Sequence, residues 1–161
     1  MNAREKTKRS TIANSFTIAA VTALALGLAP AAKADDKGCS SASLMGTFGF
    51  TSTGFRTAPT TLAGPIAQVG TQTFDGSGGT TATATFNQNG NTFKVTITGT
   101  YTVNSDCTGT FTLQVSPIGI TTRLSFVIDD TGTELLVICT DPGVVLTGTA
   151  RRQFPRGDPR Q

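Results

Sequence analysis

The chain has 161 residues, with 13 Lys or Arg against 10 Asp or Glu, and it contains neither histidine nor tryptophan. This length fits one compact domain, and the lack of histidine excludes Ser-His-Asp and Cys-His catalytic pairs and removes the commonest zinc ligand. Threonine occurs 31 times and phenylalanine 10 times. Such a composition is typical of β-strands.

The N-terminus has the three parts of a secretory signal. Residues 4–9 are basic, residues 16–29 are apolar, and Ala32-Lys33-Ala34 supplies small residues around a cleavage site. We therefore expect residues 1–34 to be a signal peptide that directs Sec export to the periplasm or the medium. The apolar run is short for a bilayer span, which favours a chain without a stable membrane anchor over an uncleaved N-terminal anchor.

The net positive charge comes from the two ends of the chain. Residues 1–34 carry a net charge of +4 and residues 151–161 carry +3, whereas residues 35–150 carry −4. A nucleic-acid-binding domain needs a basic folded surface, so we expect no nucleic-acid partner. We expect residues 35–150 to form the folded domain, a β-barrel on the strand pattern given below, and the Arg- and Pro-containing residues 151–161 to form a flexible tail.

Apolar residues alternate with threonine through most of residues 35–150, the pattern of strands with one buried face. In the clearest strand, Phe93, Val95, Ile97, Tyr101 and Val103 share one side. Residues 133–139 are nearly all apolar, which predicts a strand covered on both faces. The pattern predicts eight strands, over residues 44–54, 66–75, 80–87, 92–103, 110–115, 121–128, 133–139 and 144–151.

Short turns such as Asn89-Gly90 join these strands into a meander. Closing a meander into a barrel removes its exposed edges. We therefore predict an all-β fold, a small antiparallel eight-stranded up-and-down barrel, with a two-sheet β-sandwich as the alternative. Residues 55–65 form a longer connection that suits either a lid at the barrel mouth or a plain surface loop. The candidates for the barrel interior are Phe48, Phe86, Phe93, Phe111 and Phe126.

Several motifs resemble those of a known family. Residues 39–48 read CSSASLMGTF, residues 73–78 read TFDGSG, and residues 99–110 read GTYTVNSDCTGT, the most specific of the three. Over residues 39–152 the chain resembles small exported bacterial proteins of the allene oxide cyclase barrel-like family. The resemblance implies an antiparallel eight-stranded barrel, loosely similar to lipocalins. It implies no activity, because no catalytic motif of the plant cyclases matches here.

Three cysteines in an exported protein suggest one disulfide and one free thiol. Loop entropy does not discriminate among the three possible pairings. Position favours Cys39 with Cys107, because both lie outside the strands, whereas Cys139 lies within an apolar strand and is expected to be buried. The family resemblance implies the same pairing.

The remaining polar residues suggest no catalytic or metal site. The acidic residues other than Glu134 lie in or beside predicted turns, and Arg123 lies on the face opposite Leu124, Phe126 and Ile128. We expect no metal and no cofactor.

The leading hypothesis is a non-catalytic exported barrel that binds a small apolar ligand or serves as an interaction module. The alternatives are a cyclase or isomerase directed by cavity shape and a structural envelope protein with a filled core. Both ligand hypotheses require a cavity larger than one water molecule.

Overall fold

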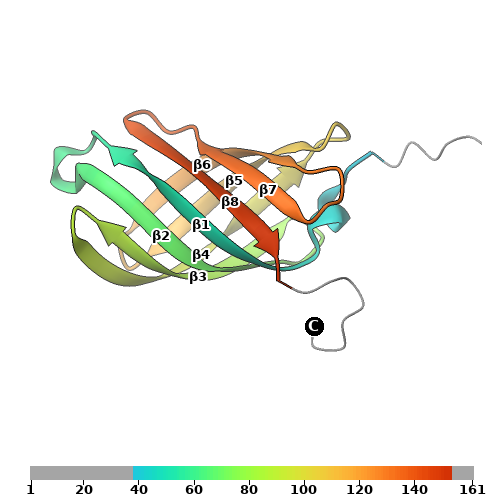
Figure 1. The fold of residues 1–161 in the computed structure, drawn as a ribbon, viewed down its shortest axis with the longest axis horizontal. Coiled ribbons are helices and arrows are strands. Elements are labelled where there is room, and N and C mark those ends of the chain that lie inside the picture. Colours follow the sequence, from blue (N-terminus) through green and yellow to red (C-terminus); the bar gives the residue numbers. More distant parts are fainter. Residues whose placement is uncertain (1–37, 154–161) are drawn as a thin grey trace, which may run out of the picture. The chain divides into compact units, whose positions relative to one another are not determined.

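The computed structural model describes residues 38–153, so the predicted signal peptide lies outside the described residues. Within this range eight antiparallel strands form a closed barrel in which each strand pairs with its neighbours in chain order and β1 pairs with β8 (Figure 1). The strands are β1 (Gly46–Arg56), β2 (Gly64–Phe74), β3 (Gly79–Gln88), β4 (Asn91–Val103), β5 (Thr108–Ser116), β6 (Ile120–Ile128), β7 (Glu134–Cys139) and β8 (Val144–Arg152).

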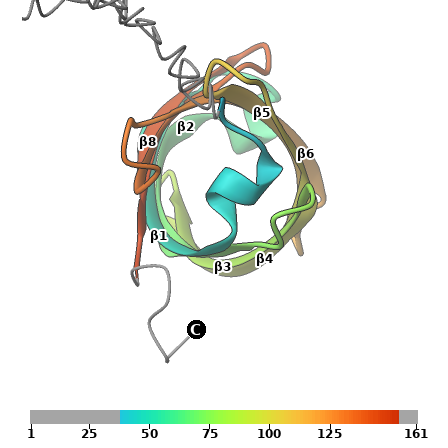
Figure 2. The same ribbon diagram turned by 90° about the vertical axis from the view of Figure 1, so that its right-hand side faces the viewer.

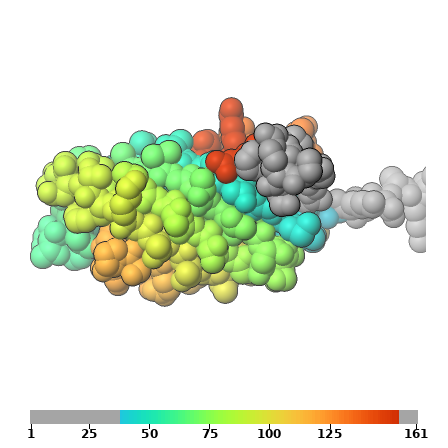
Figure 3. Space-filling view, turned by 90° about the horizontal axis from the view of Figure 1, so that it is seen from below, coloured from blue at the N-terminus to red at the C-terminus, as the bar shows by residue number. Residues whose placement is uncertain are grey.

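The alternation of the sequence builds this wall directly. In β4, for example, Val95 and Ile97 are buried while Lys94, Thr96 and Thr98 are exposed, because successive side chains point to opposite faces of a strand. Figure 3 shows in space-filling form the side of the barrel on which β3 and β4 lie. The predicted eight-stranded up-and-down barrel is confirmed, and the two-sheet sandwich is wrong.

One end of the barrel is crossed by a short helix that the sequence did not predict. The 3-10 helix η1 (Ser41–Leu44) lies across the ring of strands in the end view of Figure 2. We expected Leu44 to begin the first strand, but its side chain is fully buried at the end of η1 and β1 begins at Gly46. A four-residue helix contains too little sequence to show a helical period.

The connection between β1 and β2 is shorter than predicted. Two of its residues extend β1 and two begin β2, so the loop proper covers residues 57–63 and contains the 3-10 helix η2 (Thr60–Leu62). No helix within residues 38–153 is long and apolar enough to cross a membrane.

The prediction that residues 133–139 are covered on both faces is wrong. Leu136 and Ile138 point outward and are 57% and 52% exposed. They pair across the sheet with Thr149 and Thr147 of β8, respectively, and nothing within residues 38–153 covers that side of the wall. An apolar run in a barrel strand therefore indicates only that one of its faces is buried.

The last strand of the barrel extends beyond the predicted end of the domain at residue 150. Arg151 and Arg152 belong to β8 rather than to a flexible tail, and the Gln153 N–H donates to the carbonyl of Thr47 at 3.0 Å. Their alternation continues that of the strand, with Arg151 outward beside Glu134 and Arg152 turned toward the end of the lumen. The rest of the predicted tail, residues 154–161, lies outside the described residues.

Candidate functional site

The barrel interior holds four of the five phenylalanines proposed for it. Phe48, Phe86, Phe111 and Phe126 are all at least 95% buried. Phe93 is the exception, because its side chain is 43% exposed. It lies near the start of β4, whereas β4 pairs with β5 only from Thr96 onward. The wall is therefore incomplete beside Phe93, and we correct its assignment from the interior to the rim.

The end of the lumen crossed by η1 is sealed by several independent contacts. The predicted disulfide is confirmed, since Cys39 and Cys107 are joined and tie the segment before η1 to the β4–β5 loop, while Cys139 is free and buried. The Tyr101 hydroxyl accepts the Gly76 N–H at 3.0 Å and donates to the Ser41 carbonyl at 3.1 Å. Burial raises the pKa of this phenol, which therefore stays neutral and able to donate.

Arg152 completes the seal. Its guanidinium donates to the carbonyls of Met45, Ser43 and Gly132 at 2.6, 3.1 and 3.4 Å. It also lies 4.6 Å from the centre of the Phe48 ring, within cation–π range. These contacts occupy backbone acceptors of two loops and of η1 at once, so this end of the barrel is closed.

Aromatic rings fill the lumen next to the seal. Phe74 lies 5.2 Å from both Phe48 and Tyr101 and 5.8 Å from Phe111, measured between ring centres, and Phe111 lies 4.4 Å from Phe126. Such ring pairs contribute packing energy beyond the area they bury. The space available to a ligand therefore lies farther from η1.

A cavity of about 50 Å³ lies in the middle of the lumen. By the same measure one water needs roughly 10–15 Å³, so the cavity is larger than one water molecule. Its wall is mostly apolar, with Ala82, Ile97, Leu124 and Leu146 among the lining residues. This void meets the condition that both ligand hypotheses required.

Polar side chains also face this cavity. Gln68 Nε2 donates to Ser52 Oγ at 2.7 Å, and Gln72 Nε2 donates to Thr80 Oγ1 at 3.0 Å. Ser52, Gln68 and Gln72 line the cavity. No donor within residues 38–153 reaches the Oε1 atom of either glutamine. The cavity thus combines an apolar wall with two amide groups that can orient a polar substituent.

The opposite end of the barrel, which we call the open mouth, is bordered by the loop that contains η2, and the disulfide found within residues 38–153 lies at the other end. The open mouth is formed by the ends of β1 and β3, the start of β8 and the loop at residues 57–63. A pocket of about 130 Å³ lies there, lined by Thr61, Leu62, Ala63, Gln88, Asn89, Asn91 and Phe93. The exposed ring of Phe93 is thus part of a pocket wall.

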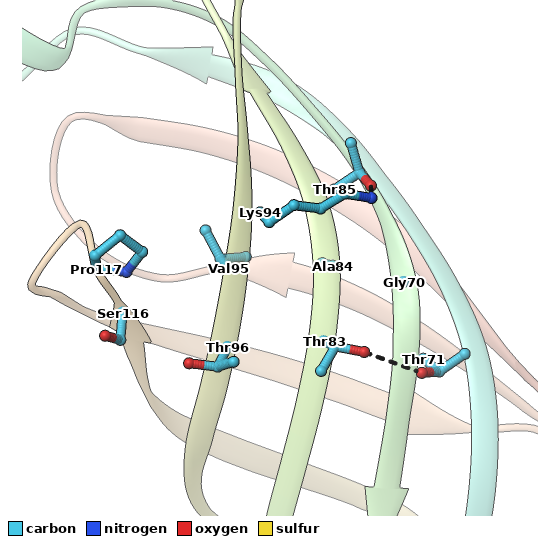
Figure 4. A pocket seen from close by; sticks show the side chains of 10 residues that line it. All are labelled: Gly70, Thr71, Thr83, Ala84, Thr85, Lys94, Val95, Thr96, Ser116 and Pro117. Carbon is cyan, nitrogen blue, oxygen red and sulfur yellow. Dashed lines mark hydrogen bonds between the residues drawn. The ribbon is translucent and has the colours of Figure 1, made fainter.

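A larger hollow, about 460 Å³, lies on the outer wall over β2, β3 and β4 (Figure 4). Three of the threonine hydroxyls that line it already have partners. Thr71 and Thr83 are 3.5 Å apart, and Lys94 Nζ donates to Thr85 Oγ1 at 2.7 Å. This hollow reflects the curvature of a threonine-covered sheet, and the lumen remains the better candidate site.

The carboxylates are engaged in loops rather than in the lumen. Partial burial acts to raise the pKa of Asp129, but hydrogen bonds from the Thr131 hydroxyl and from the N–H groups of Glu134 and Thr133 outweigh it and lower the pKa to about 2. Asp75 likewise accepts three loop N–H groups, which lower its pKa. Both side chains organise turns.

Arg123 lies outside the barrel, as expected. Its side chain is 63% exposed and pairs with Asp141 at 3.4 Å. No group of three or more acidic, histidine or cysteine side chains within the described chain is arranged to hold a metal ion. The polar groups that the described residues direct toward the lumen are amides, hydroxyls and two guanidinium groups, that of Arg152 at the sealed end and that of Arg56, the last residue of β1, at the open mouth.

Sequence reasoning missed these polar residues of the lumen, although a signal for them was present. Ser52 shares the parity of Phe48 within β1, and Gln88 shares that of Phe86 within β3. Strict alternation places each on the inner face. The interior was predicted from the apolar residues of each strand alone, so the polar residues on the same face were not included.

Comparison with known proteins supports the fold and goes no further. No family model matches the chain, and no curated protein matches it. Two solved structures are similar, both described as redesigned β-barrels bound to DFHBI. The first, mFAP1, has a TM-score of 0.50 and 21% identity over 70% of this chain and 97% of its own. The second, mFAP0, has a TM-score of 0.46 and 21% identity over 68% of this chain and 99% of its own. The similarity to mFAP1 places this chain among small closed antiparallel β-barrels.

Proposed function

We propose that this chain is an exported barrel that binds a small, largely apolar molecule in its lumen and admits it through the open mouth. The observation that carries the proposal is the mid-lumen cavity of about 50 Å³, whose apolar wall includes the amides of Gln68 and Gln72. A core that served stability alone would gain from filling this void. The amide nitrogens of Gln68 and Gln72 already donate to Ser52 and Thr80, and their Oε1 atoms are available to accept a hydrogen bond from a ligand.

Binding is favoured over catalysis by the groups available. Within residues 38–153 the carboxylates lie in turns or on the outer face. The free thiol of Cys139 lies 3.7 Å from the Thr122 hydroxyl and 3.9 Å from Asp141 Oδ2, and Cys139 is not among the residues that line the mid-lumen cavity. General acid–base chemistry needs a group of suitable pKa within reach of the substrate. The lumen groups can orient a ligand but are poor proton carriers at neutral pH.

The disulfide is consistent with the proposed export, because structural disulfides form and persist in oxidising compartments. Cys39 and Cys107 close the end opposite the open mouth. The barrel that we propose therefore has a fixed end and an accessible end, an arrangement that suits uptake of a small molecule from the surrounding medium.

The test uses a neutral dye and a variant that fills the cavity. The chain lacks tryptophan, so the fluorescence of N-phenyl-1-naphthylamine is read with little protein background. Ala82 lines the cavity and is 7% exposed, whereas Ala67 of β2 faces solvent. We expect Ala82→Val to weaken dye binding at least about tenfold, since a tenfold loss corresponds to about 1.4 kcal/mol, and we expect Ala67→Val to leave it unchanged.

The dye is larger than the cavity of about 50 Å³, so its binding requires that the lumen and the open mouth form one site. If the wild-type protein fails to bind the dye, or if both variants bind it equally well, that site is refuted. Native mass spectrometry of protein purified from its own compartment then identifies the natural occupant. A co-purified apolar molecule supports a binding protein, whereas turnover of an epoxide or polyene without a retained ligand would replace the proposal with cavity-directed isomerisation.

A further inference from the structure

Two buried side-chain nitrogens have no hydrogen-bond partner within residues 38–153. They are Nε of Arg56 and Nε2 of Gln88. Gln88 is 6% exposed, so almost its whole side chain is out of water. Leaving a buried donor without an acceptor costs about 1–3 kcal/mol, and more for a charged group. Two such donors in a small domain call for an explanation.

Both donors lie at the open mouth. Arg56 is the last residue of β1 and pairs with Gly64 of β2 and Val144 of β8. Gln88 is the last residue of β3 and pairs with Ile66 of β2. The two side chains therefore come from the strands on either side of β2, at the same end of the barrel. Each is on the inner face by alternation, since Phe55 beside Arg56 is exposed and Gln88 itself is buried.

The charge of Arg56 is not balanced by a carboxylate. Asp141 is the one acidic residue that the described chain places in a turn at this end, and it is bonded to the backbone and guanidinium of Arg123. The other described acids, such as Asp75 and Asp129, lie in the loops at the sealed end. The open mouth thus holds a partly buried cation that lacks a counter-ion within residues 38–153.

Apolar surface lies beside these donors. The pocket of about 130 Å³ at the mouth is lined by Gln88 itself together with Leu62 and the half-exposed ring of Phe93. A molecule in this pocket would contact an aromatic face and an aliphatic side chain while its polar end approached the Gln88 amide. The pocket therefore suits an amphiphile better than a bare ion.

We infer that the ligand of this barrel carries a carboxylate, which Arg56 and Gln88 receive at the mouth, while its apolar part contacts Leu62 and Phe93 in the mouth pocket and extends from there toward the lumen. The inference rests on the proposed lumen binding. Arginine binds carboxylates through two parallel N–H groups, and Nε–H is one of the donors available for that pairing. The Gln88 amide adds a neutral donor for the same group. The occupant would satisfy both buried donors and neutralise the cation.

The test compares two probes of nearly the same shape, 2-naphthoate and 2-acetylnaphthalene, which differ in the negative charge. We expect the wild-type protein to bind 2-naphthoate at least about tenfold more tightly, since a hydrogen bond to a charged group contributes about 1.5 kcal/mol or more. Arg56→Met should abolish this preference, because it weakens the binding of 2-naphthoate more than that of 2-acetylnaphthalene. Arg123→Met removes a cation from the outer face and should retain the preference.

Gln88→Met provides a second variant, which keeps the length of the side chain and removes its unpaired donor. We expect it to weaken 2-naphthoate binding severalfold and to raise the midpoint of urea unfolding without ligand, because a buried donor without an acceptor is removed. If Arg56→Met fails to fold, this variant decides the question.

The outcomes separate the two proposals. Equal affinity of the wild-type protein for both naphthalene probes, with N-phenyl-1-naphthylamine still bound, overturns the carboxylate inference and leaves lumen binding standing. A preference that survives both Arg56→Met and Gln88→Met also overturns it. Failure of all three probes to bind refutes lumen binding, and the carboxylate inference with it.

Discussion

Arg152 is predicted to be a major stabilising residue although it stands at the very end of the barrel. Its guanidinium donates to three carbonyls and lies over the Phe48 ring. Replacing it by methionine keeps an apolar stem of similar reach on that ring and removes the donors and the charge. The three carbonyls then lose the donor that joins two loops to η1.

The expected magnitude follows from these contacts. The two shorter hydrogen bonds contribute about 0.5–1.5 kcal/mol each, and a partly exposed cation–π contact adds about 0.5–1 kcal/mol. We therefore expect Arg152→Met to lower the free energy of unfolding by about 2–3 kcal/mol. Arg151→Met is the matched control, because Arg151 is 75% exposed and makes only a surface ion pair with Glu134 at 3.2 Å. Such pairs contribute about 0–1 kcal/mol.

Urea unfolding of the oxidised protein, followed by far-ultraviolet circular dichroism, measures both variants. With a slope of about 1–3 kcal/mol per molar urea, the loss at Arg152 moves the midpoint by roughly 1 M or more, and the loss at Arg151 moves it much less. Equal and small shifts of the urea midpoint for the two variants would show that Arg152 does not anchor the seal. They would favour the original prediction that Arg152 belongs to a flexible tail.

Two further predictions concern the sealed end. Replacing Cys39 and Cys107 together by serine removes a cross-link between residues 68 positions apart and should lower the free energy of unfolding by about 4 kcal/mol in the chain-entropy estimate; a loss below about 1 kcal/mol in urea unfolding would contradict it. The pKa of Asp129 is lowered from 3.8 to about 2 in the folded chain, so its ionised form stabilises the fold above about pH 4 and this contribution is lost as the pH falls toward 2. Asp129→Asn should therefore make the free energy of unfolding depend less on pH across that interval. An unchanged pH dependence would refute this role.

The barrel was predictable because buried apolar residues alternate with exposed polar residues along most of its strands. In β3, Ala82, Ala84 and Phe86 are buried and Thr81 and Thr83 are exposed. A similar period is present in most of the other strands, although β7 is apolar on both faces. Turn signals such as Asn89-Gly90 then limited the connections to hairpins. With every strand adjacent to the next, closure was the only arrangement that left no exposed edge.

The errors fall where long-range contacts, and not local pattern, decide the structure. Leu44 leaves the first strand because it is fully buried at the end of η1, a helix whose carbonyls accept hydrogen bonds from Tyr101 and Arg152, and only the closed barrel brings these residues together. Phe93 has the correct parity for the interior, but the stagger of β4 against β5 leaves it at the rim. Stagger is a property of the strand pairing, and the alternation of a single strand does not contain it.

The two ends of the barrel use the same residue type in opposite ways, and this contrast locates the site. Arg152 and Arg56 are inward residues at the ends of adjacent strands, β8 and β1. The first has carbonyl acceptors and an aromatic face, whereas Nε of the second is buried without an acceptor within residues 38–153. Burying an unpaired charge works against folding, and a domain of marginal stability gains by losing such a group. Stability accounts for Arg152 but not for Arg56, so a function at the open mouth is the better reason for arginine at that position.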